Sequence, residues 1–294
     1  AYPGVNMAGV SLSGMIKNRQ AFGPGIPGVV HMRHTWTPEN RFVKGQPETG
    51  VELAEDLLRI AANYGPDTIA ACVVEPVAGS TGCLVPPKGY LERIREICDD
   101  HGILLVFDEV ICGFGRMGTP FASQAFGVTP DIMTMAKALT NAAQPMGAVA
   151  VSDKVYDTIV DGSPDGAIEF FHGYTYSAHP AACAAGIATM EIFEKENLIE
   201  RAAELSEYFL DQVFALSDIP MITDIRGYGL FAGIDLEPMG NPGVRGLDFQ
   251  KRMFKNGLHL KMTGDAALIS PPLIAERHHI DKICEVMRQT LAEY

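Results

Sequence analysis

The sequence predicts an α/β fold in which helices sandwich a mainly parallel β-sheet, followed by a smaller α+β domain at the C-terminus. Apolar runs of strand length, such as residues 69–74 and 103–107, alternate with segments whose apolar residues recur at helical spacing. Strands that are apolar on both faces are typical of parallel sheets covered on both sides. The 294 residues, 47% hydrophobic and 20% charged, can form a substantial core, which excludes a disordered chain, a collagen or a small disulfide scaffold.

The elements of the first part can be placed in order. Residues 1–50 are rich in Gly, Pro and Asn, so a long loop region with little regular structure is expected there. The pattern then predicts helices at residues 50–63 and 90–101 and buried strands at residues 69–74, 103–107, 131–135 and 146–151. Gly102 is the expected C-terminal glycine of the second helix. Acidic residues, Glu75 and Asp108, directly follow the first two strands.

The second part has a different pattern. The sequence predicts helices at residues 180–194, 196–216, 248–255 and 276–294, and an antiparallel strand pair within residues 222–236. We therefore expect residues 1–198 to belong to the large domain and residues 199–294 to form a small C-terminal domain. No internal repeat or low-complexity tract interrupts either part.

Charge and cysteine usage restrict the partners. Lys and Arg number 23 against 36 Asp and Glu, and the net charge of −13 argues against nucleic-acid or membrane-surface binding. The expected partner is a small molecule or another protein. No apolar run approaches the length of a membrane-spanning helix. The six cysteines form no C-x-x-C pair, which predicts reduced, mostly buried thiols in a soluble cytoplasmic protein.

Lys137 is the strongest single candidate for chemistry. It lies in the uncharged apolar stretch 132–139, where burying an ammonium group is costly unless the group is paired, neutral or covalently modified. Lysines that form imines with carbonyl groups occupy such surroundings. The alternative is a lysine whose stem packs while its ammonium group reaches water.

Asp108 ends a buried strand, at the edge of the sheet where ligands of parallel sheets bind. An acid there can hold a metal, orient a histidine, pair with a protonated ring nitrogen, or only cap the next turn. When Asp108 is considered together with Lys137, fewer of these roles remain for the aspartate. A lysine for an imine and an aspartate for a pyridinium nitrogen are the two groups that pyridoxal 5′-phosphate requires.

Two glycine-rich or polar segments have competing interpretations. Residues 113–118 match G-x-G-x-x-G, but Asp108 and Glu109 precede the glycines and little room for a helix follows, so a dinucleotide fold is disfavoured.

Residues 171–180 form a polar, aromatic loop before a helix that starts at Pro180. Such a helix start binds a phosphate, or is simply capped by Ser177.

Metal and hydrolase motifs are weak. The pairs His31/His34 and His278/His279 lack a third ligand at a usual spacing, and no metal site is expected. Residues 9–14 miss the G-x-S-x-G elbow, and the chain contains no G-x-x-x-x-G-K motif.

Four longer motifs carry a family resemblance. At residues 73–82 (VVEPVAGSTG), 104–118 (LLVFDEVICGFGRMG), 131–149 (DIMTMAKALTNAAQPMGAV) and 172–186 (HGYTYSAHPAACAAG), the chain resembles the class III aminotransferases of the fold-type-I pyridoxal-phosphate enzymes. Within them it is most similar to the ω-amino acid:pyruvate, or β-alanine:pyruvate, transaminases. The resemblance extends over essentially the whole chain.

The resemblance implies a role for several residues. Lys137 would bond to the cofactor and move the proton between the substrate carbon and cofactor C4′, while Asp108 would keep the pyridine nitrogen protonated. Val110 would pack on one face of the ring and Tyr2 on the other. Thr175 would reach the cofactor phosphate of the neighbouring subunit, which implies a homodimer with shared active sites. In addition, Glu75 would lie near the cofactor and pair with a mobile arginine when no substrate carboxylate is present.

Three departures from the family pattern stand out. Pro3 replaces the histidine that usually follows the stacking aromatic. Lys261 occupies the position of the arginine that clamps a substrate carboxylate in many relatives, and a lysine offers only a point charge. Chains of the family are also longer, and the segment that precedes residue 1 in them would supply the Ser/Gly phosphate-binding loop and one wall of the substrate pocket.

The resemblance implies a transaminase that moves an amino group from a β-alanine-like amino acid or an amine to pyruvate or a related oxo acid by a ping-pong mechanism. Lys261 keeps a second class III activity open, such as an amine or diamine transaminase or an aminomutase. A catalytically silent paralogue that acts as a binding protein is the alternative outside the enzymes.

Overall fold

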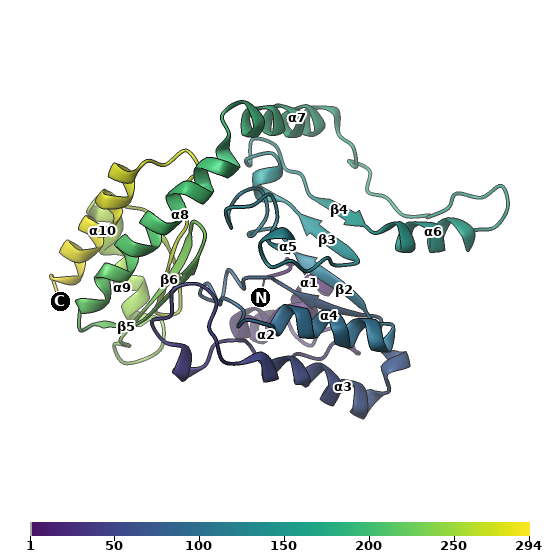
Figure 1. Ribbon diagram of the computed structural model, residues 1–294, viewed down its shortest axis with the longest axis horizontal. Helices are drawn as coiled ribbons and strands as arrows, with labels where there is room; N and C mark the ends of the chain where they lie inside the picture. Colours follow the sequence, from purple (N-terminus) through teal and green to yellow (C-terminus); the bar gives the residue numbers. More distant parts are fainter. Residues whose placement is uncertain (1) are drawn as a thin grey trace.

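The first β-sheet confirms the α/β fold (Figure 1). The computed structural model describes residues 2–294. Three strands run parallel and the fourth is antiparallel to its neighbour, in the order β1 (Ala71–Val74), β2 (Leu104–Asp108), β3 (Ile132–Met135) and β4 (Ala148–Val151). Each lies within one or two residues of a run that the apolar pattern predicted. The predicted burial was wrong for β4, which has three exposed residues, and β3 is only partly buried, because β4 is the edge strand beside the exposed arm.

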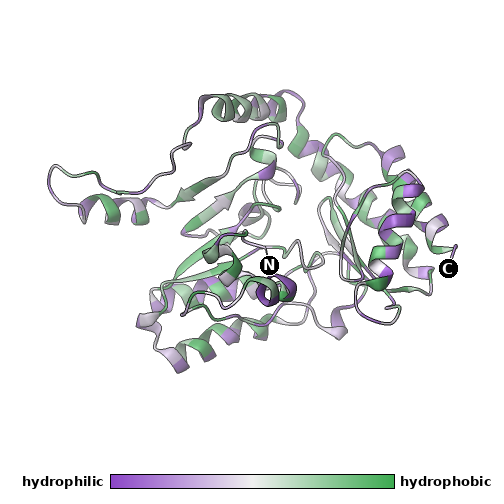
Figure 2. Cartoon of the chain, turned by 180° about the vertical axis from the view of Figure 1, so that it is seen from behind, coloured by the Kyte–Doolittle hydropathy of each residue, from purple (hydrophilic) through white to green (hydrophobic). Residues whose placement is uncertain are grey.

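Helices α3 (Asp56–Tyr64) and α4 (Tyr90–His101) pack beside each other along the first sheet (Figure 1). Their hydrophobic and hydrophilic residues alternate along the ribbon in Figure 2, as expected for helices with one buried face. Ile94 of α4 and Phe107 of β2 are fully buried in the same core. Helix α4 ends as predicted, because Gly102 adopts a left-handed conformation with φ of 66°.

The N-terminal region is more regular than the sequence predicted. Within residues 1–50 the chain forms two short helices, α1 (Met7–Leu12) and α2 (Ile16–Phe22). The Asn6 side chain begins α1 by accepting a hydrogen bond from the Gly9 N–H at 2.7 Å. The high Gly and Pro content obscured these helices because each is only two turns long or less.

The second sheet is antiparallel throughout and has the order β5-β6-β8-β7. Its strands are β5 (Ile222–Tyr228), β6 (Phe231–Leu236), β7 (Lys261–Thr263) and β8 (Ala266–Ile269). The first two confirm the predicted pair; the last two were not predicted. Three helices pack against one side of this sheet (Figure 1): α8 (Leu198–Phe214), α9 (Val244–Lys255) and α10 (Arg277–Leu291). Phe209, Phe249 and Met287 are fully buried between helices and sheet.

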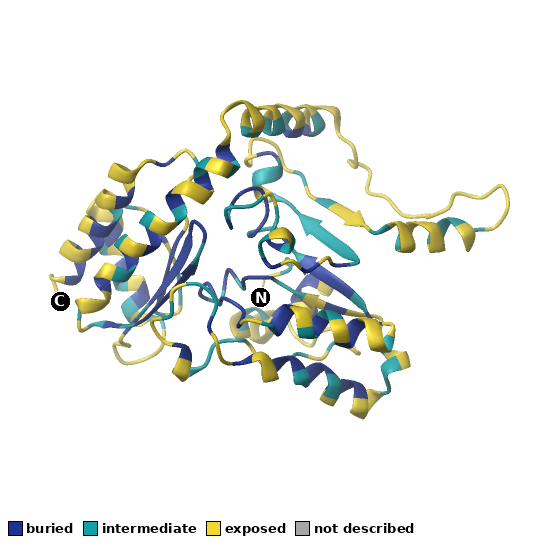
Figure 3. Cartoon of the chain, viewed as in Figure 1, coloured by how far each residue is buried: buried dark blue, intermediate teal, exposed yellow. Residues whose placement is uncertain are grey.

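An exposed arm joins the two parts. After helix α6 (Asp153–Asp161), residues 162–179 contain no helix or strand and lead to helix α7 (Pro180–Lys195). Figure 3 shows that α6 and this segment are exposed almost throughout. The domain boundary after residue 198 stays a prediction.

All six cysteines are free thiols, and all except the partly buried Cys183 are buried, as predicted. Within residues 2–294, no helix combines the length and the apolar character needed to cross a membrane.

Candidate active site

The carboxyl edge of the first sheet brings the two main candidates together. The parallel register places Asp108 of β2 beside Thr134 of β3, and the Glu109 N–H donates to the Thr134 carbonyl at 3.0 Å. Lys137 follows Thr134 by three residues, and its charge acts on the Asp108 carboxyl. Neighbouring parallel strands end at one edge, so this topology brings Lys137 and Asp108 to the same edge of the sheet.

Asp108 and Glu109 differ in how their carboxyl groups are satisfied. Glu109 is fully buried and accepts the N–H groups of Ala122 and Ser123 at 3.0 and 2.8 Å. Asp108 is half-buried and accepts the Val110 N–H at 3.0 Å. Burial raises the pKa of both carboxyls; for Asp108 the Val110 N–H opposes this rise, and the charge of Glu75 adds to it. Asp108 is therefore the acid that gains most from a nearby cation, whereas Glu109 holds the following turn.

Lys137 departs from one expectation, because its side chain is exposed rather than buried. Strand β3 ends at Met135, and Lys137 begins the 3₁₀ helix η4 (Lys137–Leu139) at the rim of the sheet. The apolar residues around it in sequence are only partly buried themselves. Its backbone is left-handed with φ of 47°, which is uncommon for a residue with a side chain. Asn141 and Ala142 share this conformation, and such strain concentrates at functional sites.

Glu75 lies at the start of a tight loop, residues 75–84, that follows β1. Its Oε2 accepts the Gly79 N–H at 2.8 Å, and its negative charge is felt by Asp108. The loop closes with an antiparallel bridge between Ala78 and Leu84. The structure thus brings Glu75 to the same edge as Asp108 and Lys137.

Lys261 reaches the same loop from the second sheet. It begins β7, and its Nζ lies 3.4 Å from Oγ of Ser80, a residue that is 4% exposed. Ser80 was not singled out by the sequence, although it lies inside the motif 73–82. Its position between Glu75 and Lys261 would have been hard to infer, because it depends on contact between the two sheets.

Three predicted site residues remain: Val110, Tyr2 and Thr175. Val110 directly follows the two acids and is partly buried. Tyr2 is 43% exposed, and its stacking role stays a prediction. Thr175 lies in an exposed turn of the arm at residues 175–178.

The glycine motif at residues 113–118 does not form a dinucleotide site. These residues make a series of turns, and the helix that follows, α5 (Ala122–Ala125), has four residues. Arg116 instead bonds to the carbonyls of Leu230 and Pro271 at 3.0 and 2.6 Å. The motif therefore contacts the second sheet. The part of the chain that the structure describes also contains no cluster of His, Cys, Asp and Glu suited to a metal ion.

Curated relatives match nearly the whole chain. An omega-aminotransferase of Caulobacter vibrioides is 54% identical over 294 residues, which cover 99% of this chain and 67% of that protein. A beta-alanine–pyruvate aminotransferase of Pseudomonas aeruginosa is 44% identical over 293 residues, which cover 99% and 65%. The chain thus spans about two thirds of the length of the curated relatives it matches.

Structural and family comparisons agree with these matches. The crystal structure of an omega transaminase from Pseudomonas jessenii in complex with PMP has a TM-score of 0.91 and 33% identity, and the match covers 100% of this chain and 66% of that chain. The fold is therefore that of the fold-type-I class III transaminases. The family model described as Aminotransferase class-III matches residues 1–291. The chain therefore belongs to the class III aminotransferase family.

Proposed function

We propose that the protein is a pyridoxal-phosphate-dependent transaminase. It moves an amino group from an ω-amino acid or amine to pyruvate or a related oxo acid. The observation that supports the proposal is that Lys137 and Asp108 follow the ends of neighbouring strands, at one edge of the first sheet. The relatives named for β-alanine and pyruvate support the substrate class.

The residues at this edge fit the cofactor. Asp108 presents a half-buried carboxyl whose pKa is raised by burial, and a protonated ring nitrogen supplies the cation that favours its charged form. Lys137 offers an exposed amine on a backbone held in an uncommon conformation. Val110 adds a partly buried apolar surface next to the aspartate for one ring face. These groups match what pyridoxal 5′-phosphate needs: a bonding amine, a counter-charge and an apolar contact.

Each side chain then has a defined task. When bound, pyridoxal 5′-phosphate withdraws the negative charge that develops at the substrate carbon as its C–H bond breaks. Asp108 would hold the proton on the ring nitrogen, and Lys137 would carry the proton between the substrate carbon and cofactor C4′. Glu75 and Lys261, which contact the same loop, would border the substrate. The donor would leave as a carbonyl compound with its nitrogen retained by the cofactor, and the oxo acid would then take up that nitrogen, which would make the kinetics ping-pong.

We include a homodimer with shared active sites in the proposal. The arm that carries Thr175 exposes large aromatic side chains: Phe171 is 91%, Tyr174 75% and Tyr176 80% exposed. Such a patch supports burial against another protein surface. Thr175 would then bind the cofactor phosphate of the partner subunit.

We also propose that the protein acts in the cytoplasm, because its cysteines are free thiols.

A donor panel tests the proposed function. Purified protein is supplied with pyridoxal 5′-phosphate and pyruvate, and alanine formation is measured with β-alanine or with a carboxylate-free amine as donor. We expect alanine with at least one donor and parallel double-reciprocal plots. A protein that binds the cofactor but forms no alanine with either donor would contradict the proposal and support the catalytically silent paralogue.

Lys261 favours one second candidate, an amine or diamine transaminase. A lysine holds a carboxylate less specifically than the two-pronged guanidinium of an arginine. A relative from Pseudomonas aeruginosa that is 37% identical is named a putrescine–pyruvate aminotransferase. A higher kcat/KM for the carboxylate-free donor than for β-alanine would select this activity.

A further inference from the structure

Arg226 is a buried cation that the proposed chemistry does not use. It lies in β5 and is 6% exposed. Its guanidinium binds Asp235 through two hydrogen bonds of 2.8 and 2.6 Å and also bonds to Asp224. Burial by itself lowers the pKa of Arg226, but the hydrogen bonds and charges of Asp235 and Asp224 outweigh it, so that the pKa is raised. The side chain is therefore charged and fixed in orientation.

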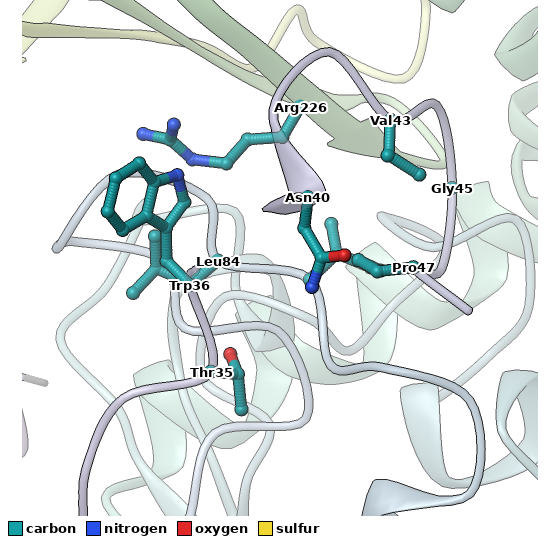
Figure 4. A pocket seen from close by; sticks show the side chains of 9 residues that line it. Thr35, Trp36, Asn40, Val43, Gly45, Pro47, Leu84 and Arg226 are labelled. Atoms are coloured by element: carbon teal, nitrogen blue, oxygen red, sulfur yellow. The ribbon is translucent and has the colours of Figure 1, made fainter. Parts of the chain in front are cut away.

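The same network holds the N-terminal region. Asp224 is 1% exposed and accepts the Trp36 indole N–H at 2.8 Å and the Phe42 N–H at 2.7 Å. Figure 4 shows the guanidinium of Arg226 directed toward the indole of Trp36, at the wall of a cavity of about 10 Å³. A cavity of this size holds no more than about one water molecule. The guanidinium thus has little room to change its position.

A series of hydrogen bonds leads from Arg226 to the candidate active site. Its Nε donates to the Gly82 carbonyl at 2.8 Å. The Gly82 N–H donates to the Gly79 carbonyl at 3.1 Å, and the Gly79 N–H donates to Glu75 Oε2 at 2.8 Å. Glu75 in turn acts on Asp108 through its charge. Three consecutive hydrogen bonds therefore connect a residue of the second sheet to a carboxylate beside the cofactor edge.

Close backbone packing makes this connection rigid. A Cβ atom on Gly233 of β6 would lie 2.3 Å from the Gly82 oxygen, and one on Gly82 would lie 2.9 Å from an Arg226 nitrogen. On the opposite side, a Cβ atom on Gly79 would lie 2.5 Å from Ile111, which follows β2. The loop 75–84 is therefore held between the two sheets, and only glycines permit this approach.

From these contacts we infer that Arg226 is a positioning residue of the transaminase, an inference that rests on the proposed function. By holding the Gly82 carbonyl, Arg226 fixes the loop 75–84 and with it the Glu75 carboxylate relative to Asp108 and Lys137. It touches neither substrate nor cofactor and acts through Glu75. The second sheet thereby sets the geometry of an active site whose chemical groups lie on the first sheet.

The test compares Arg226→Lys with Arg288→Lys. A lysine at 226 keeps a charge for the two aspartates but cannot hold Asp235 with two nitrogens and Gly82 with a third. Arg288 is the matched control, since it binds Asp218 twice at 2.9 Å and the Ala215 carbonyl at 2.8 Å on the exposed surface of α10. In cofactor-free protein we expect Arg226→Lys to speed amide hydrogen exchange in residues 76–84 about tenfold or more. Arg288→Lys leaves this rate within about twofold.

A double-mutant cycle shows whether Arg226 acts through Glu75. The readout is the visible circular dichroism of bound pyridoxal 5′-phosphate, which reports the orientation of the ring. Arg226→Lys and Glu75→Gln should each reduce the band, and the double variant should match Glu75→Gln alone. Where Arg226→Lys fails to fold, Trp36→Phe replaces it, because it removes only the indole N–H from Asp224, with the same non-additive result expected at smaller size.

Unchanged exchange in residues 76–84, or additive losses of dichroism in the cycle, would overturn the inference. The exchange measurement needs no cofactor and no turnover. A wild-type protein that transfers no amino group would therefore refute the proposed function, while the exchange rates would still decide whether Arg226 holds the loop.

Discussion

The two sheets differ sharply in how completely they are covered. All four residues of β8 are buried, and β5 and β6 are buried at most positions. In contrast, β4 has three exposed residues out of four and β3 is only partly buried (Figure 3). Helices α8, α9 and α10 give the second sheet an apolar core of its own.

This difference suggests that the second sheet contributes mainly to the stability of the fold and the edge of the first sheet mainly to its chemistry. The second sheet packs against Phe209 and Phe249, which are fully buried, whereas the carboxyl edge of the first sheet presents Lys137, Asp108 and Glu75. Lys137, Asn141 and Ala142 are exposed and have left-handed backbone conformations. Such backbone strain costs stability and concentrates at functional sites. Substitutions in the first sheet edge should therefore reduce activity with little loss of stability, and substitutions in the second core should do the reverse.

Lys137→Ala has the largest expected effect on activity. Removal of the amine eliminates both the bond to the cofactor and the proton carrier, so we expect kcat to fall by roughly a thousandfold or more. The melting temperature should change little because the side chain is exposed. Steady-state alanine formation and calorimetry measure the two effects; a large drop in melting temperature would contradict the assignment of Lys137 to chemistry.

Phe209→Ala tests the opposite side of the comparison. Phe209 of α8 is fully buried in the second core, and deletion of its ring should lower the free energy of unfolding by about 3–5 kcal/mol. Phe254 is the matched control, since it lies on α9 and is 66% exposed; Phe254→Ala should change stability by no more than about 0.5 kcal/mol. Urea titration measures both, and equal losses would refute the separate core.

Asp108→Asn should lower kcat by about a hundredfold while the cofactor remains bound. An amide cannot hold the proton on the ring nitrogen, but it keeps the size of the side chain. Glu109→Gln, at the neighbouring residue, is the comparison. It weakens the hydrogen bonds that Glu109 accepts from the Ala122 and Ser123 N–H groups, so it should reduce stability more than kcat. Near-normal turnover in Asp108→Asn, measured in single-turnover absorbance experiments, would rule out the proposed role.

Lys261→Arg has the smallest expected effect. A guanidinium can bind a carboxylate with two parallel hydrogen bonds, so kcat/KM for β-alanine should rise about fivefold relative to a carboxylate-free amine. Ser80→Ala removes the Lys261 partner without changing the charge and serves as the control. An unchanged donor ratio would place the carboxylate subsite elsewhere.

The sequence predicted the local features well. Continuous apolar runs located β1 and β2 because buried parallel strands have no polar face. The same signal located β3, which is partly buried, and β4, which is antiparallel and mostly exposed. The strand-end acids and Lys137 could be found because charges are conspicuous in apolar stretches. Strands β7 and β8 were missed because they are short, with three and four residues. They pair with each other, and β8 also pairs with β6 about thirty residues earlier in the chain. The predicted burial of Lys137 was also wrong, because its exposure depends on where β3 ends rather than on the neighbouring side chains.

The contacts between the sheets could not be predicted from the sequence. Arg226 lies in a strand whose alternation is visible, but its Gly82 partner is 144 residues away. Ser80 and Lys261 are separated by 181 residues in the same way. One signal was available for Arg226: it is a charged residue within a strand that is otherwise mostly buried, which calls for buried carboxylate partners.

Chemical trapping of the lysine is the most direct test of the central claim. The protein is saturated with pyridoxal 5′-phosphate, reduced with sodium borohydride and digested, and the modified peptide is identified by mass spectrometry. The proposed function predicts a stable pyridoxyl group on Lys137 and on no other lysine at stoichiometric yield. Recovery of unmodified Lys137, or stoichiometric modification of a different lysine, would contradict the assignment of this sheet edge as the active site.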